Sequence, residues 1–188
     1  MGMPQATEWT AAAVRTLPDD GKRYEVVDGE LLVTPSPTRD HQRIVGGLLV
    51  LLDPFVAATG LGEAVTSPSD VELDAHGLVQ PDVFVQGLVD GRPGTGWNSG
   101  APLLLVIEVL SPATARADRT VKRRRYQRAG VPEYWIVDTD ARVVERWRPS
   151  DTRPEILAES LEWTTPGAAE SLTIDLPTLF ARMRGERS

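Results

Sequence analysis

The sequence contains no cysteine and only two histidines. Without cysteine there are no disulfide bonds, and metal sites that depend on thiolate ligands are excluded. A metal site in this chain would therefore rely mainly on oxygen ligands, for which the chain supplies 27 aspartate and glutamate residues.

Long hydrophobic runs are also absent. The most apolar helical stretch, residues 44–58, is shorter than a bilayer-spanning helix and is interrupted by Asp53 and Pro54. The first ten residues, MGMPQATEWT, do not join a basic segment to an apolar one as a signal peptide does. We therefore expect a cytoplasmic protein that has no membrane partner.

Several well-known catalytic motifs are missing as well. The sequence has no GxSxG elbow, no Walker loop, no HExxH zinc motif and no dinucleotide-binding fingerprint. Enzymes that depend on these motifs are therefore disfavoured, and any chemistry must be sought in less regular combinations of residues.

Charge is distributed unevenly along the chain. The net charge of −7 argues against a protein that simply coats nucleic acid. Residues 111–130, however, hold seven basic residues against one acid, a net charge of +6, while the remaining 13 basic and 26 acidic residues give −13. This segment predicts a basic ridge that meets a polyanion, and the alternative is an ordinary solvated helix face.

Periodicity and turn residues predict a mixed α/β fold. The strongest turn signal is Asp28-Gly29, because both positions of a tight hairpin turn need positive φ. The first half of the chain is predicted to form helices at residues 10–16 and 41–59, and strands at residues 23–27, 30–34, 64–73 and 79–85.

The second half predicts a βαβ unit. Residues 103–110, LLLVIEVL, are apolar on both faces, as in a central strand. A helix over residues 114–129 and a strand over residues 133–138 follow, so the two strands should be parallel, and residues 142–148 add another strand. The earlier strands, joined by short turns, should be antiparallel. We predict one α/β domain with a mixed β-sheet flanked by helices.

Two carboxylates interrupt the apolar pattern of the strands. Asp82 follows Pro81 at the start of one strand, and Glu108 is the only charge in the 103–110 strand. A carboxylate buried in a central strand is costly unless it pairs or binds a cation. If the two strands are antiparallel neighbours, the acids approach each other, and magnesium would relieve their repulsion, with the carbonyl of Val109 as a further ligand.

The helix after Glu108 carries a second group of polar residues. Asp118, Lys122 and Tyr126 are spaced i, i+4 and i+8, so they share one face. A lysine beside a metal-bound water could orient it or stabilise the charge that develops on a phosphate. The alternative is an Asp118–Lys122 surface pair. Two carboxylates alone would also suit a glycosidase, but the lysine and the basic helix favour a phosphate substrate.

Taken in order, these residues resemble the Uma-two family of restriction endonucleases. The motifs that carry the resemblance are Pro81-Asp82, Glu108-Val109-Leu110-Ser111-Pro112, Asp118, Lys122, Tyr126 and Gly130-Val131-Pro132-Glu133-Tyr134-Trp135. Upstream pieces agree with it: Tyr24-Glu25, Asp28-Gly29-Glu30, Ser36-Pro37 and His41. The resemblance covers residues 24–148 and implies the restriction-endonuclease-like fold of the PD-(D/E)XK nuclease superfamily.

The resemblance also implies an activity. It makes Asp82 and Glu108 ligands of Mg²⁺, or of Mn²⁺ in its place, in a metal-dependent endonuclease that hydrolyses phosphodiester bonds of nucleic acid, with DNA the expected substrate. The lysine of the superfamily motif normally lies two residues after the acid, where this chain has Leu110. The resemblance therefore points to Lys122 as the catalytic lysine. Because many endonucleases of this fold act as dimers, a homodimer stays open.

Further candidates surround this centre. The residues predicted to bind substrate are Arg116, Arg119, Arg123, Tyr126, His41 and Ser111. Tyr126 could instead pack against the sheet, His41 could be structural and Ser111 could cap a turn. Glu25 and Glu30 could complete a metal shell, although surface charges on a hairpin explain them more simply.

The predicted organisation is a single domain over residues 1–188, with a nuclease-like core at about residues 20–148 and a C-terminal extension at residues 149–188. Two other functions stay open. One is a catalytically inactive module of the same fold that binds nucleic acid or protein, which the missing in-motif lysine and the acidic surface favour. The other is a metal-dependent hydrolase that acts on a smaller phosphate ester.

Overall fold

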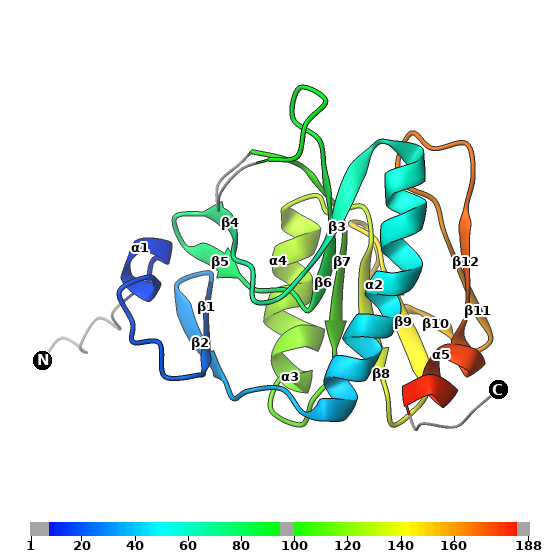
Figure 1. Ribbon diagram of the computed structural model, residues 1–188. Helices are drawn as coiled ribbons and strands as arrows, with labels where there is room; N and C mark the ends of the chain where they lie inside the picture. The colour runs from blue at the N-terminus through cyan, green and yellow to red at the C-terminus, as the bar shows by residue number, and fades with distance from the viewer. Residues whose placement is uncertain (1–7, 95–99, 184–188) are drawn as a thin grey trace, which may run out of the picture.

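The computed structural model describes residues 8–94 and 100–183. Its central element is a six-stranded mixed sheet with the order β10-β9-β8-β7-β6-β3 (Figure 1). The six strands are β3 (Gly62–Thr66), β6 (Val83–Gly87), β7 (Leu103–Val109), β8 (Tyr134–Asp138), β9 (Val143–Trp147) and β10 (Glu155–Leu157).

The predicted βαβ unit lies at the centre of this sheet. Strand β7 pairs with β8 in parallel, and the other neighbouring strands pair antiparallel. The crossover between β7 and β8 is a helical segment built from α3 (Ala115–Ala117), the π-helical turn η1 (Asp118–Lys122) and α4 (Arg123–Arg128). The predicted parallel pair is therefore confirmed, and the predicted helix is present with an unforeseen π turn in its middle.

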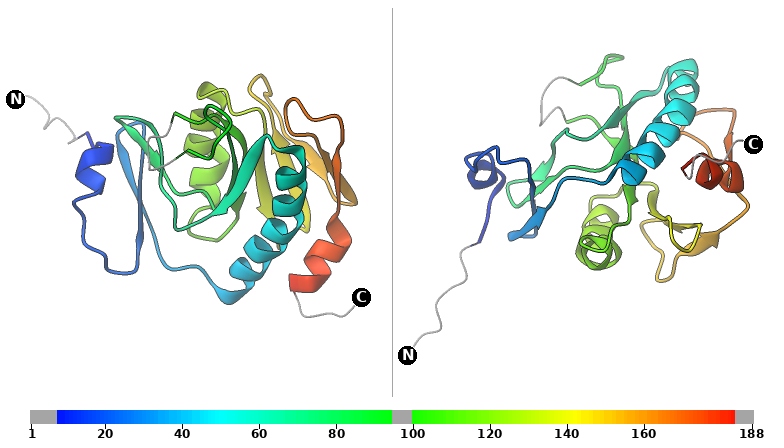
Figure 2. Two further views of the ribbon diagram at one scale, coloured as in Figure 1. Left: turned by 45° about the horizontal axis from the view of Figure 1, so that its top comes forward. Right: turned by 60° about the horizontal axis from the view of Figure 1, so that its bottom comes forward.

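Helices cover both faces of the sheet (Figure 2). The crossover segment lies on one face, and α2 (Arg39–Thr59) lies on the other. Thr38 caps the start of α2 by accepting a hydrogen bond from the backbone N–H of His41, and Gly60 ends the helix at φ 65°, a left-handed conformation that suits glycine. By length and composition α2 is the one helix within the described ranges that could cross a membrane. Its buried residues pack against the sheet, as in the core helix of a globular protein.

A second, four-stranded sheet lies beside the first, with the order β2-β1-β5-β4. Its strands are β1 (Arg23–Val27), β2 (Glu30–Thr34), β4 (Val71–Asp74) and β5 (Gly77–Val79), and α1 (Ala11–Val14) packs against it. The predicted hairpin turn is confirmed, because Asp28 and Gly29 have φ values of 53° and 80°. The four-stranded sheet lies on the side of the crossover helix, so β1 of the β1–β2 hairpin lies next to that helix (Figure 1).

Two strand predictions were wrong. Residues 64–73 and 79–85 each form parts of two strands that belong to different sheets: β3 and β4 in the first case, β5 and β6 in the second. In each case a proline, Pro68 or Pro81, lies in the break, and proline cannot donate the hydrogen bond that continues a strand. The expectation of one mixed sheet was therefore incomplete.

The C-terminal segment completes the core on the side of α2. It forms the two-stranded sheet β11 (Ser160–Trp163) and β12 (Leu172–Asp175), followed by α5 (Leu176–Met183). Leu161, Trp163, Ile174 and Phe180 are buried in the same hydrophobic cluster as α2 and β7. The division into a nuclease-like core and an extension stays a prediction.

Candidate active site

Strand β7 places Glu108 on the face of the sheet that the crossover helix covers. Ile107 and Val109 point into the apolar cluster beneath α2, and Glu108, which lies between them, points to the opposite face. Val83 of β6 pairs with Ile107 in antiparallel register. Continuing this register by one residue brings Asp82 opposite Glu108, so both carboxylates face the same side.

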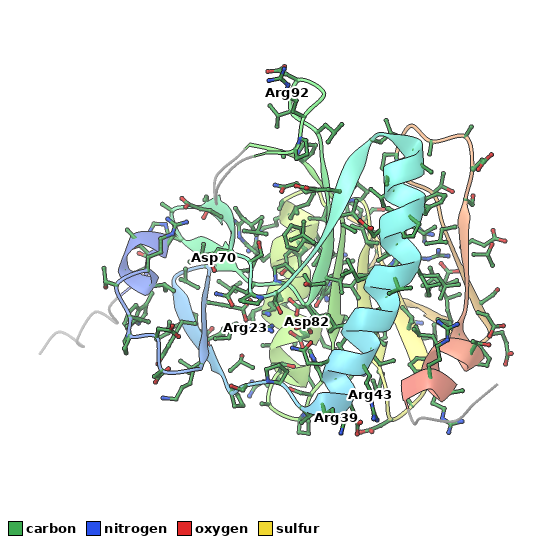
Figure 3. The ribbon with its side chains drawn as sticks, viewed as in Figure 1. Arg23, Arg39, Arg43, Asp70, Asp82 and Arg92 are labelled. Carbon is green, nitrogen blue, oxygen red and sulfur yellow. The ribbon has the colours of Figure 1, made fainter. Side chains whose placement is uncertain are left out.

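Asp82 is buried, and both of its carboxylate oxygens have partners. Its Oδ1 accepts a hydrogen bond from Nη1 of Arg23 at 2.9 Å, and its Oδ2 accepts one from the backbone N–H of Val109 at 2.8 Å and lies 3.0 Å from Nε2 of His41. Figure 3 shows Arg23 next to Asp82 between the two sheets. Burial opposes ionisation of Asp82, but His41, Arg23 and the N–H of Val109 together keep its pKa below the ordinary value. Asp82 is therefore a carboxylate at neutral pH.

Lys122 lies between two acids from different strands. Its Nζ is 2.9 Å from Oε1 of Glu108 and 2.9 Å from Oε2 of Glu25, and all three side chains are at most 3% exposed. Glu25 is held in place because its Oε1 accepts a hydrogen bond from the backbone N–H of Gln80 at 2.8 Å. Burial raises the pKa of Glu108 well above its ordinary value, while the charge of Lys122 works in the opposite direction.

Asp118 and Lys122 both point inward from the π turn. In this wider turn the two residues lie on the buried side of the helix, with 3.7 Å between Oδ1 of Asp118 and Nζ of Lys122. Asp118 is 1% exposed, and burial raises its pKa to about 6. The alternative of an Asp118–Lys122 surface pair was therefore wrong, because both groups are enclosed.

This environment defines what Lys122 can do. Burial alone would lower its pKa, but the charges of Glu108, Glu25 and Asp118 outweigh this effect and raise the pKa above the ordinary value. The amine is thus protonated at neutral pH, so it can donate hydrogen bonds and stabilise negative charge but cannot act as a general base. Tyr126 supports the same cluster, because its hydroxyl donates to Oε1 of Glu108 at 3.2 Å.

A pocket of about 460 Å³ opens onto the two facing carboxylates. It is lined by Arg23, His41, Asp82, Glu108 and Val109, together with residues 34–38 and residues 110–114. Sequence reasoning therefore placed Asp82, Glu108, Val109, His41 and Ser111 in one site, and the structure brings all five to this pocket.

The donor set of this pocket fits magnesium better than a metal that needs several protein ligands. Among the described residues, no three His, Asp or Glu side chains gather as a metal site. Two carboxylates and a backbone carbonyl are enough for Mg²⁺, which keeps several waters and takes further oxygens from a substrate phosphate. Asp82, Glu108 and Val109 are the residues that would hold Mg²⁺ in this pocket.

The basic segment does not form the free ridge that its composition predicted. Arg119 binds Glu145 and Asp138, Arg125 binds Asp74, and Arg128 binds Asp28. These arginines are neutralised by acids that lie far away in the sequence, which no local charge count can reveal.

Other residues predicted to bind substrate lie apart from the pocket. Arg123 stacks on the ring of Trp147 with its guanidinium 4.5 Å from the ring centroid, and Arg116 is exposed on α3. Neither of them, nor Arg119, belongs to the described lining of the pocket. Tyr126 is completely buried, so it contacts Glu108 and the sheet instead of solvent.

Two residues of β1 carry more of the site than the sequence indicated. Arg23 was not predicted to be functional, and Glu25 was treated mainly as a surface charge. The two residues are two positions apart on one strand, so their side chains lie on the same face. This spacing was the sequence signal that could have identified them together. Glu30, by contrast, is exposed on β2, outside the site.

Comparisons with known proteins agree with this fold. A crystal structure from Anabaena variabilis ATCC 29413, described as a putative nuclease belonging to DUF820, matches with a TM-score of 0.74 at 20% sequence identity, over 93% of this chain and 99% of that one. This likeness shows the fold and confirms the predicted mixed α/β architecture. No curated protein matches the chain.

The family assignment comes from the sequence itself. The model of the Uma2 family, described as "Putative restriction endonuclease", matches residues 11–177. This range contains both strands that carry the acids, the π turn with Lys122 and the N-terminal strand β1. The chain belongs to the Uma2 family.

Proposed function

We propose that this protein hydrolyses phosphodiester bonds of nucleic acid with the help of Mg²⁺, and that DNA is its substrate. The observation that carries the proposal is the meeting of Asp82 and Glu108 at one pocket, with the protonated Lys122 held against Glu108. Membership of the Uma2 family supports the same chemistry.

Each residue has a defined part in this proposal. Asp82, Glu108 and the carbonyl of Val109 would hold Mg²⁺. When bound, this ion would polarise the phosphate and make its bound water more acidic. Lys122 would donate a hydrogen bond to the attacking water or to the phosphate oxygen on which charge develops. Arg23 and His41 would keep Asp82 ionised and oriented, and Glu25 would hold Lys122.

Cleavage assays with single variants test this proposal. Wild type should cut nucleic acid when Mg²⁺ is added, and Asp82→Asn, Glu108→Gln and Lys122→Met should each lose about 10²-fold or more of the rate. Glu145→Gln is the matched control, because Glu145 is also a buried acid but pairs with Arg119 away from the pocket. Circular dichroism shows whether each variant is folded. Full activity of a folded Glu108→Gln protein would overturn the proposal.

A catalytically inactive binding module is the second candidate. The observation that favours it is that both oxygens of Asp82 already have partners in Arg23, His41 and Val109. Isothermal titration with Mn²⁺ near neutral pH separates the two candidates: heat of binding that disappears in Asp82→Asn supports the nuclease, and no binding supports the module. Nucleotides and small phosphate esters belong in the same substrate panel as DNA and RNA.

A further inference from the structure

The reactive carboxylates lie deep in the molecule. The side chains of Asp82 and Glu108 are each only 3% exposed, and the route to them is the pocket of about 460 Å³. A volume of this size is typical of pockets that enclose a small ligand. It can take one phosphate with an adjoining sugar and base, but a double helix, whose major groove alone is about 12 Å wide, must stay outside.

The lining of the pocket includes apolar side chains among polar ones. Pro35 and Pro37 come from the segment before α2, and Leu110 and Pro112 come from the segment after β7. Prolines have a fixed φ, which limits local changes of the backbone at these positions. Apolar side chains of this kind can contact the faces of unstacked bases, whereas the bases of an intact duplex are stacked on one another.

The charges around the pocket also disfavour a duplex. Of the described residues that line it, the basic ones are Arg23 and His41, and both contact Asp82. Asp40 and Asp140 line it too and add negative charge. Proteins that bind duplex DNA neutralise several phosphates with lysine and arginine side chains. Several arginines that could provide such contacts here are bound to acids of the same chain, as described above for the crossover helix.

We propose that the substrate of this site is an unpaired nucleic-acid strand, such as a single strand or a single-stranded tail, and not an intact duplex. The proposal rests on the proposed phosphodiesterase function and adds the class of substrate. An unpaired strand can bend its backbone and insert one phosphate into the pocket. A duplex would have to flip a nucleotide out of its stack first, at a cost of a few kcal/mol.

A set of end-labelled substrates of one sequence tests the proposal. The set contains single-stranded DNA, single-stranded RNA, blunt duplex DNA and a duplex with a 20-nucleotide tail (roughly two turns of a helix), each incubated with the full chain and Mg²⁺. We expect single strands to be cut about 10-fold faster than the blunt duplex or more, with cuts confined to the tail of the tailed duplex. The DNA and RNA arms show which strand is preferred.

The outcomes separate this proposal from the function on which it rests. Cleavage of the blunt duplex at the same rate as the single strand, or faster, overturns the substrate class and leaves the nuclease standing. No cleavage of any member of the set overturns the nuclease function and the substrate class together.

A pair of tryptophan variants tests the pocket itself. Ala113 lines the pocket and is exposed, so Ala113→Trp should obstruct it and weaken binding of a fluorescent single strand by about 10-fold or more, measured by anisotropy. Val50→Trp is the matched control, because Val50 is 65% exposed on α2 and does not line the pocket. Equal binding by the two variants would contradict the proposal.

Discussion

The two faces of the six-stranded sheet are made by the same strands but differ in polarity. Toward α2, β7 presents Leu105, Ile107 and Val109, all buried in one apolar cluster. Toward the crossover helix, the same strand presents Glu108, which meets Lys122. One face is therefore a conventional core, and the other, the charged face, combines buried charges with an apolar cluster that includes Val106.

Both faces bury apolar side chains, and only the charged face also buries ionisable groups at its centre. Burial of apolar side chains stabilises the folded state by about 25 cal/mol per Å². Removing charges from water costs several kcal/mol per ion, which their mutual attraction only partly offsets. Buried and perturbed ionisable groups that lie next to a pocket are typical of a functional site. We infer that the charged face is kept for chemistry.

Loss of the positive charge of Lys122 should destabilise the charged face more than the other changes described below. Lys122→Met leaves Glu25, Glu108 and Asp118 buried without their shared partner, so we expect the free energy of unfolding to fall by about 3–5 kcal/mol at pH 7. Urea denaturation measures this change. Arg124→Met, an exposed basic residue on the same helix, is the control and should change stability by less than about 0.5 kcal/mol. Equal effects of the two substitutions would contradict this view of the charged face.

Neighbouring residues of β7 should separate stability from function. Ile107→Ala removes a fully buried side chain from the apolar face and should lower the free energy of unfolding by about 2–5 kcal/mol, while the folded fraction still binds Mn²⁺. Glu108→Gln should do the reverse, with little loss of stability and no Mn²⁺ binding. Denaturation and isothermal titration of both variants provide the comparison. Loss of Mn²⁺ binding in folded Ile107→Ala protein would show that the two faces are not independent.

Protonation of Asp118 should make the stability of the charged face depend on pH. Its folded-state pKa of about 6 exceeds the ordinary 3.8, so the folded state binds the proton more tightly than the unfolded state. This contribution to stability is complete below about pH 4 and is lost as the pH rises through about 6. Asp118→Asn should therefore gain stability relative to wild type as the pH rises from 4 to 7, as measured by urea denaturation at several pH values. A constant difference across this range would argue against the raised pKa.

Surface ion pairs at the edge of the charged face should matter least. Arg128 and Asp28 are both about half exposed, so Arg128→Gln should lower the free energy of unfolding by less than about 1 kcal/mol. The same substitution should leave Mn²⁺ binding unchanged in isothermal titration. A larger loss of stability would show that the arginines of this helix contribute more than solvent-screened pairs do.

The features that were predicted correctly from the sequence depend on a local residue pattern or on the pairing of two strands. The 103–110 strand, the parallel partner after the helix and the hairpin at Asp28-Gly29 were all found. The convergence of Asp82 and Glu108 followed from assuming that their strands are antiparallel neighbours, which they are.

Features that depend on contacts between distant parts of the chain were missed. Arg23 reaches Asp82 only because the four-stranded sheet packs beside the six-stranded one. The π turn leaves no distinct periodic signal over a single turn, so it was not predicted, although the i, i+4 spacing placed Asp118 on the same face as Lys122. The pairing of the basic segment likewise involves acids such as Asp28 and Asp74, which precede it by dozens of residues.

A crystal of the full chain grown with Mn²⁺ tests the central claim most directly. The account predicts one strong anomalous peak between the carboxylates of Asp82 and Glu108, with Lys122 still bound to Glu108. Its absence from a Glu108→Gln crystal would identify the ligand. A wild-type crystal that has no peak at this position, or has its strongest peak elsewhere, would contradict the account.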